Sequence, residues 1–150
     1  MTRVASVLAI ATIGFLGAGC GSVDEQNAYV DQVNELRTEL LSQVSELTSS
    51  ATPSNAAQAA HLSGQLEEAY TSAADGLDAV EAPDEVADLH AQLVAGLRGI
   101  ADQIDEAQRA LNQATSVQAV QALTDLQTSV SQAETELADL IDQINAEFQD

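Results

Sequence analysis

The chain has 150 residues, of which 45% are hydrophobic and only 3% aromatic, and it contains neither Trp nor Lys. All 24 carboxylates follow residue 23, where three arginines oppose them, so the formal charge from Cys20 onward is −21. Such a surface repels phosphate backbones, which proteins bind mainly through Lys and Arg, and we expect no nucleic acid as a partner. The apolar fraction and a strong helical periodicity favour a folded domain over a disordered acidic chain.

The first 19 residues have the features of an export signal. Arg3 gives a short positive region, and residues 4–16 form an apolar stretch of the length that secretory signals require. This stretch is shorter, and richer in Gly, Ser and Thr, than a permanent span of about 20 residues. We therefore predict a signal peptide over residues 1–19, a short tether over 20–23 and an acidic helical domain over 24–150.

Residues 16–22 read Leu-Gly-Ala-Gly-Cys-Gly-Ser, with small residues before a cysteine and a flexible stretch after it. This pattern resembles the lipobox of bacterial lipoproteins, although Gly17 stands where that family usually has Leu. The resemblance covers about 20 residues and implies cleavage before Cys20, a diacylglyceryl thioether on its sulfur and often acylation of the new amino group.

Physical arguments agree with a lipid on Cys20. Two or more long acyl chains hold a protein at a bilayer far better than one. Cys20 is also the only cysteine, so it has no intramolecular disulfide partner in an oxidising compartment. We predict that the membrane is a partner through this lipid and that the protein faces outside the cytoplasm. Plain secretion and a cytoplasmic protein with an apolar start are the alternatives.

Four segments of similar length then show apolar residues at helical spacing, over about 24–50, 53–81, 83–112 and 116–148. The third segment is the clearest, because its apolar positions from Val86 to Leu111 recur in steps of three and four. Pro53 and Pro83 suit the first turn of a helix, and Thr115 with Gln118 fits a capping box. No strand pattern is present, so we expect an all-α protein with short connections.

Short connections force sequential long helices to run in opposite directions. The fold predicted is an antiparallel up-down-up-down four-helix bundle, in which each helix buries one apolar stripe. Long helical hairpins that pair as a dimer would satisfy the same pattern and are the alternative.

In the bundle, the end near Cys20 would gather acids and the far end would be neutral and polar. The acids of the near end are Asp24, Glu25, Asp75, Asp78, Glu81, Asp84, Glu85, Asp88, Glu147 and Asp150. The functional interpretation is that an anionic bilayer repels the acidic near end, while the polar far end binds a partner. The structural interpretation, which we favour, is that acids gather at helix starts and turns are polar.

The sequence contains no convincing catalytic, cofactor or metal site. His61 and His90 would lie roughly 21 Å apart at helical rise, too far to share a metal. His90 flanks Leu89 and Leu93, as expected of a hydrogen-bonded residue at the core margin. The carboxylates lack the spacing of an EF-hand loop, although the Asp75 to Asp88 cluster could attract divalent cations diffusely.

We expect the three arginines of the domain to form ion pairs that stabilise the fold. Arg109 follows Asp105 by four residues, and Arg98 precedes Asp102 by four, as in ion pairs along one helix face. For Arg37 the expected partners are Glu67 or Glu134 on other helices.

Residues 82–93 (Ala-Pro-Asp-Glu-Val-Ala-Asp-Leu-His-Ala-Gln-Leu) are similar to segments of small uncharacterised exported helical proteins of high-GC bacteria. That resemblance implies no activity. The function expected is a non-enzymatic cell-envelope lipoprotein that serves as a helical interaction or spacer module, with an envelope protein as its possible partner. The alternative is a binding module that holds a hydrophobic or cationic small ligand between its helices, for which Gly64, Gly76, Gly96 and Gly99 leave a groove or allow close packing.

Overall fold

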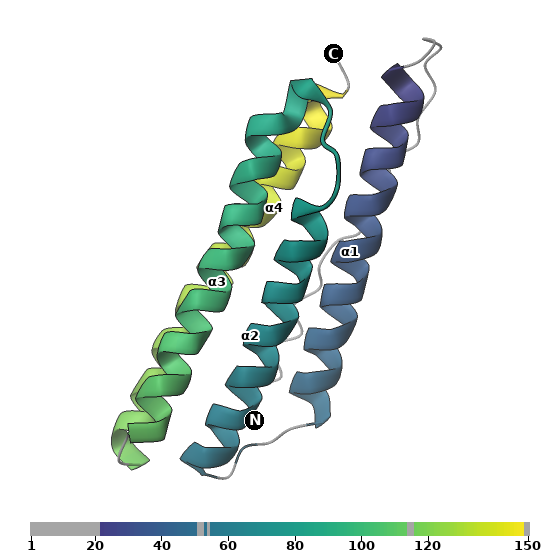
Figure 1. Cartoon of the computed structure of the whole chain (residues 1–150). Coiled ribbons are helices and arrows are strands. Elements are labelled where there is room, and N and C mark those ends of the chain that lie inside the picture. The colour runs from purple at the N-terminus through teal and green to yellow at the C-terminus, as the bar shows by residue number, and fades with distance from the viewer. Residues whose placement is uncertain (1–21, 51–52, 54, 114–115, 149–150) are drawn as a thin grey trace.

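The computed structural model describes residues 22–50, 53, 55–113 and 116–148, and these residues form a bundle of helices (Figure 1). The elements are α1 (Ser22–Ser50), α2 (Ala56–Asp78), the 3₁₀ turn η1 (Asp84–Val86), α3 (Ala87–Gln113) and α4 (Ser116–Glu147). No strand occurs within these described ranges. The all-helical class and the bundle predicted from the apolar spacing are therefore confirmed.

α1 begins at Ser22, two residues before the predicted start at 24 and inside the predicted tether, and both ends of the second helix differ from the prediction by three residues. The second helix begins at Ala56 rather than at Pro53, because the Oδ1 of Asn55 accepts a hydrogen bond of 3.0 Å from the backbone N–H of Gln58. This cap satisfies a donor at the start of the helix that has no partner inside it. The same helix ends at Asp78, three residues before the predicted end at residue 81 and five before Pro83. Thr115 of the predicted capping box lies outside the described residues.

Pro83 precedes a single 3₁₀ turn, and α3 continues from it. The backbone N–H of Val86 donates to the carbonyl of Pro83 at 3.0 Å, and Val86 is fully buried. The carboxylates of Asp84 and Glu85 occupy this first turn, where the positive end of a helix favours them. The connection thereby directs the apolar stripe of α3 toward the core.

The core is aliphatic and is centred on α3. This helix packs most extensively on α2 and next on α4, whereas α1 packs mainly on α2. The stripe predicted for the third segment is largely buried, with Ile100 and Ile104 at 0% and 1% exposure. Much of the buried face of α2 consists of small side chains, which let helices approach closely; the buried alanines are Ala59, Ala60, Ala69, Ala73 and Ala74.

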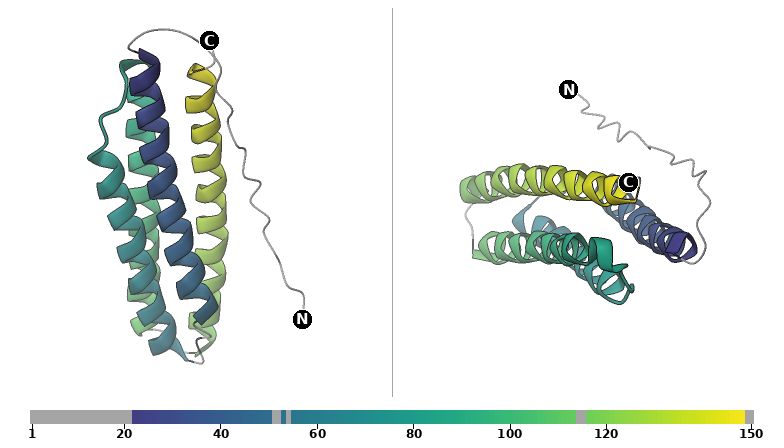
Figure 2. Two further views of the ribbon diagram at one scale, coloured as in Figure 1. Left: turned by 90° about the vertical axis from the view of Figure 1, so that its right-hand side faces the viewer. Right: turned by 90° about the horizontal axis from the view of Figure 1, so that it is seen from above.

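The apolar stripe of α1 is covered less completely. Tyr29 is the one buried residue among the described side chains of this helix, and the predicted stripe beyond it is half-buried: Val30, Val33, Leu36, Leu40, Val44 and Leu47. Figure 2 shows α1 between α2 and α4 in one view and at the edge of the bundle in the other. Because α1 rests mainly on α2, its side toward α4 stays partly open.

Two glycines allow close packing next to that opening. A Cβ added at Gly76 would lie 2.9 Å from the Cδ2 of Leu36, and one added at Gly96 would lie 2.6 Å from the Cδ2 of Leu137. Real Cβ atoms do not tolerate such distances, so these positions bring the leucines of α1 and α4 against α2 and α3. Of the two roles expected for the glycines, close approach therefore applies at Gly76 and Gly96.

Candidate functional site

An apolar groove runs between α1 and α4, with a cavity volume of about 300 Å³. All four helices contribute to it. Its lining residues are Val33, Leu36, Arg37, Leu40, Leu41, Val44, Tyr70, Ala73, Leu77, Leu93, Leu97, Glu134, Leu137, Ala138 and Ile141. The floor consists of side chains that belong to the buried core, such as Leu77, Leu93 and Leu97. The groove is thus the place where the uncovered side of α1 gives access to the interior.

The walls of the groove are aliphatic, and its polar groups are few. Leu41 on the α1 wall is 45% exposed, and among the residues whose side chains the structure describes it is the one large apolar side chain with that much exposure. Arg37, Tyr70 and Glu134 supply the ionisable groups of the lining. A small number of polar groups in an apolar concavity is typical of small-molecule sites.

Tyr70 links α2 to α4 at this groove. Its hydroxyl donates to Oε1 of Glu134 at 2.9 Å. Burial raises the pKa of Tyr70 far above its usual value of 10, and the charge of Glu134 and this hydrogen bond raise it further. The phenol is consequently a permanent donor that holds the Glu134 carboxylate in place.

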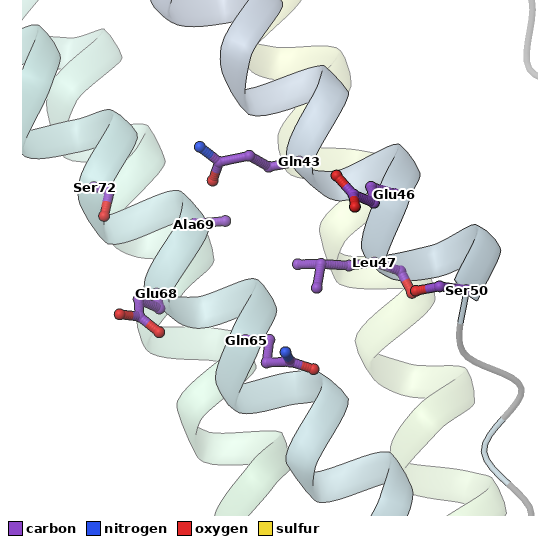
Figure 3. Close-up of a pocket in the computed structure, with 8 residues that line it drawn as sticks. All are labelled: Gln43, Glu46, Leu47, Ser50, Gln65, Glu68, Ala69 and Ser72. Carbon is purple, nitrogen blue, oxygen red and sulfur yellow. The ribbon is translucent and has the colours of Figure 1, made fainter.

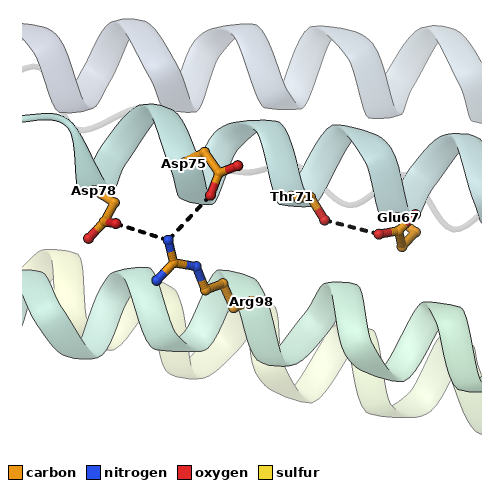
Figure 4. Close-up of polar contacts among 5 residues, drawn as sticks. All are labelled: Glu67, Thr71, Asp75, Asp78 and Arg98. Atoms are coloured by element: carbon orange, nitrogen blue, oxygen red, sulfur yellow. Dashed lines mark hydrogen bonds and ion pairs between the residues drawn. The ribbon is translucent and has the colours of Figure 1, made fainter.

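Arg37 has neither of the partners predicted for it. Glu134 accepts from Tyr70, and Glu67 accepts from the hydroxyl of Thr71 at 3.1 Å (Figure 4). No ion pair involves Arg37 within the part of the chain that the structure describes. The prediction was therefore wrong. Arg37 lies half-exposed in the groove wall, and its positive charge is not neutralised there.

The pairing predicted for Arg98 was also wrong, whereas that of Arg109 is confirmed. Arg98 bonds across to α2, at 3.2 Å from Asp75 and 3.0 Å from Asp78 (Figure 4), instead of along α3 to Asp102. On α2, Arg98 can pair with two carboxylates at once, whereas α3 offers only Asp102. An arginine that precedes its acid along a helix is also the weaker arrangement of such a pair. Arg109 pairs with Asp105 as expected. Exposed pairs of this kind contribute about 0–1 kcal/mol each.

A larger hollow between α1 and α2 has a different character. It has a volume of about 510 Å³, and Figure 3 shows side chains from both helices around it. The lining consists of Gln43, Glu46, Leu47, Ser50, Gln65, Glu68, Ala69 and Ser72. Ala69 is the one buried member, and most of the others are exposed polar groups. This hollow is therefore a solvated furrow on the surface, and the smaller apolar groove is the better candidate site.

Part of the predicted acidic end lines a third hollow, of about 450 Å³. Glu25 comes from α1, while Glu81, Asp84 and Glu85 come from the connection between α2 and α3. Within the described ranges, no three His, Cys, Asp or Glu side chains are placed to hold a metal ion.

The two histidines occupy different environments. His61 is exposed near the start of α2. His90 is 8% exposed near the start of α3, where its Nδ1 lies 3.1 Å from the hydroxyl of Tyr29. The ring of Tyr29 also meets the ring of Phe148 edge-on, with centroids 5.9 Å apart. His90 is therefore a hydrogen-bonded residue of the core margin, as its sequence neighbours predicted.

The pKa of His90 makes the stability of the bundle depend on pH. Burial lowers this pKa, while the charge of Asp78 on α2 and a backbone hydrogen bond with Leu77 partly oppose the shift. The unfolded chain, in which His has a pKa of about 6.5, then takes up a proton before the folded chain does. The contribution of neutral His90 is complete above pH 6.5 and is lost as pH falls toward the lower folded value. Tyr29, which faces His90 from α1, stays neutral because burial raises its pKa to about 12.

We expect the difference in unfolding free energy between the native chain and the His90→Gln variant to shrink when pH falls from 7.5 to 5.5. Urea unfolding followed by circular dichroism at several pH values measures this difference. The comparison with His90→Gln removes the effect of the carboxylates, which are common to both chains. A difference that stays constant over this range would contradict the assignment.

Cys20, the predicted lipid attachment site, and the signal peptide over residues 1–19 lie outside the described residues. In the part that is described, no helix combines the length and the hydropathy needed to span a bilayer. The chain matches no family model, and no match is found among curated proteins or solved structures.

Proposed function

We propose that this protein is a non-enzymatic lipoprotein of the cell envelope whose helical domain binds an apolar small ligand in the groove between α1 and α4. The observation that carries the proposal is the cavity of about 300 Å³ between α1 and α4. Its lining includes core leucines of the other three helices, such as Leu77, Leu97 and Leu137. This volume is at the lower limit of small-molecule sites. A spacer would have no need of an opening into its core.

The arrangement of the helices supports this use of the groove. We propose the up-down-up-down order, in which α1 and α4 close the bundle as neighbours. Gln108 of α3 bonds to the carbonyl of Ala60 on α2, whereas Arg98 pairs with Asp75 and Asp78, so higher numbers on α3 match lower numbers on α2. Tyr29 and Phe148 bring the start of α1 to the end of α4, and both ends lie together in Figure 1. One chain then encloses the groove without a second copy.

The chemistry of the groove favours binding over catalysis. Of its three ionisable side chains, Tyr70 is held protonated by burial, and Glu134 is occupied by the hydrogen bond from Tyr70. A nucleophile with an adjacent general base is the usual requirement for covalent catalysis. The lining has no Ser, Cys, His or Lys to serve as either.

The binding test uses the purified full-length chain and the neutral fluorescent probe N-phenyl-1-naphthylamine. Two exposed alanines of α4 give matched variants: Ala138 lines the groove, whereas Ala146 lies two turns away and does not. We expect saturable binding to the native chain and to Ala146→Trp, and at least about tenfold weaker binding to Ala138→Trp, whose indole fills the groove. No saturable binding to the native chain, or equal binding to a folded Ala138→Trp, would overturn the proposal.

The anchor is tested separately by mass spectrometry of the protein extracted from membranes. We expect a mature chain that begins at Cys20 and carries acyl groups, and release of Cys20→Ala into aqueous buffer. An unmodified sulfur, or a native chain that starts upstream of Cys20, would refute the lipoprotein assignment and leave the groove proposal standing.

A further inference from the structure

We infer that the ligand of the groove is a single-chain amphiphile with an anionic head group, and that Arg37 binds this head group. The inference rests on the proposed function, because it assigns the class of the ligand. It has two parts, which are the shape of the apolar cavity and the position of the one arginine in its wall.

The shape of the cavity suits a linear hydrocarbon chain. The α1 residues that line it extend from Val33 to Val44, a distance of about 16 Å at the rise of an α-helix. The lining of α2 and α4, from Tyr70 to Leu77 and from Glu134 to Ile141, extends about 10 Å in the same direction, so the cavity of about 300 Å³ is elongated along the helices. Its walls are mainly leucine, valine, isoleucine and alanine, so a flexible alkyl chain meets aliphatic side chains throughout. Burial of each methylene in such a cavity favours binding.

Arg37 is placed to bind an anion at this cavity. Its neighbours three and four residues away on α1 are Val33, Asn34, Leu40 and Leu41, none of which is acidic. Arg98 and Arg109 each pair with aspartate, so Arg37 is the domain arginine that has no carboxylate partner among the described residues. A guanidinium binds carboxylate and phosphate oxygens through two parallel hydrogen bonds. The alkyl chain would then lie in the groove with its head group at the guanidinium.

Glu134, on the opposite wall, determines how strongly this binding depends on Arg37. Its carboxylate repels an anionic head group, as does the net charge of −20, although salt screens charges beyond about 8 Å. Without Arg37 the groove would hold only repulsive charge. A cationic head group would instead have to pair with a carboxylate that is exposed to water and already accepts from Tyr70.

The test compares twelve-carbon ligands by isothermal titration of the full-length chain: dodecanoate, dodecyl phosphate and dodecyltrimethylammonium, each below its micelle concentration, and 1-dodecanol below its solubility limit. We expect at least one of the two anions to bind about tenfold or more tightly than 1-dodecanol, and their order distinguishes a carboxylate from a phosphate head group. Arg37→Gln should abolish this preference by weakening the binding of the preferred anion about tenfold or more. Arg109→Gln removes the same charge from an arginine outside the groove and should keep the preference.

Tighter binding of the ammonium compound, or a preference for anions that survives Arg37→Gln, would overturn the assignment of the head group. An equal loss in Arg109→Gln would also overturn it, since net charge alone would then explain the effect. In each of these results 1-dodecanol still binds, and the proposed function stands. If none of the four compounds binds, the proposed function itself fails.

Discussion

Replacement of Ile100 by alanine is expected to lower the free energy of unfolding by about 2–5 kcal/mol. Ile100 is 0% exposed on α3 and belongs to the cluster that joins the bundle. The variant loses the transfer free energy of the removed carbon atoms and leaves a cavity that rigid neighbouring helices fill only in part. Such a loss is a large share of the 5–15 kcal/mol that stabilises a typical domain.

Urea unfolding followed by circular dichroism measures the effect. Leu41→Ala is the matched control, because Leu41 is 45% exposed and its removal leaves no buried cavity. We expect the control to change the unfolding free energy by less than about 1 kcal/mol. Similar losses in the two variants would show that α3 is not the centre of the core.

Replacement of Tyr29 by alanine is expected to cost about 3–5 kcal/mol, the range found for large aromatic side chains. Tyr29 is 1% exposed, and it contacts His90 of α3 and Phe148 at the end of α4. Its removal opens a cavity where three elements meet and deprives His90 of its hydrogen bond with the Tyr29 hydroxyl. α1 should lose its tightest attachment to the rest of the bundle.

Tyr29→Phe separates the hydrogen bond from the packing. This variant keeps the ring and removes the hydroxyl, so it should cost about 1–3 kcal/mol, the penalty of a buried polar group without its partner. Chemical denaturation of both variants, at a pH where His90 is neutral, measures the two contributions. A phenylalanine variant as unstable as the alanine variant would assign the whole effect to the hydroxyl.

The sequence predicted the helices well because apolar spacing directly reports the period of a helix. The stripe from Val86 to Leu111 forms the core face of η1 and α3, and Pro83 lies in the connection, as its position in the sequence predicts. The start of α2 was misplaced, because Pro53 and Asn55 are both acceptable boundary residues and only the cap on Gln58 decides between them. Local chemistry therefore predicts elements better than it predicts their ends.

The groove could not be predicted to the same degree. Periodicity identifies the apolar face of α1, but how far that face is covered depends on the distance between α1 and α4, which no residue pattern encodes. Tyr29 lies four residues before Val33 and extends the same stripe, and this spacing was the available signal for its burial. The partners of Arg37 and Arg98 were mispredicted for a related reason, since cross-helix pairs depend on the relative register of two helices.

The one-sided attachment of α1 creates a hierarchy of local stability. Because α1 rests mainly on α2, it can separate from the bundle while α2, α3 and α4 keep their shared isoleucines and leucines together. Its amide protons should then exchange with solvent faster than those of α3. The ligand proposed for the groove could then enter through this partial opening, without complete unfolding of the protein.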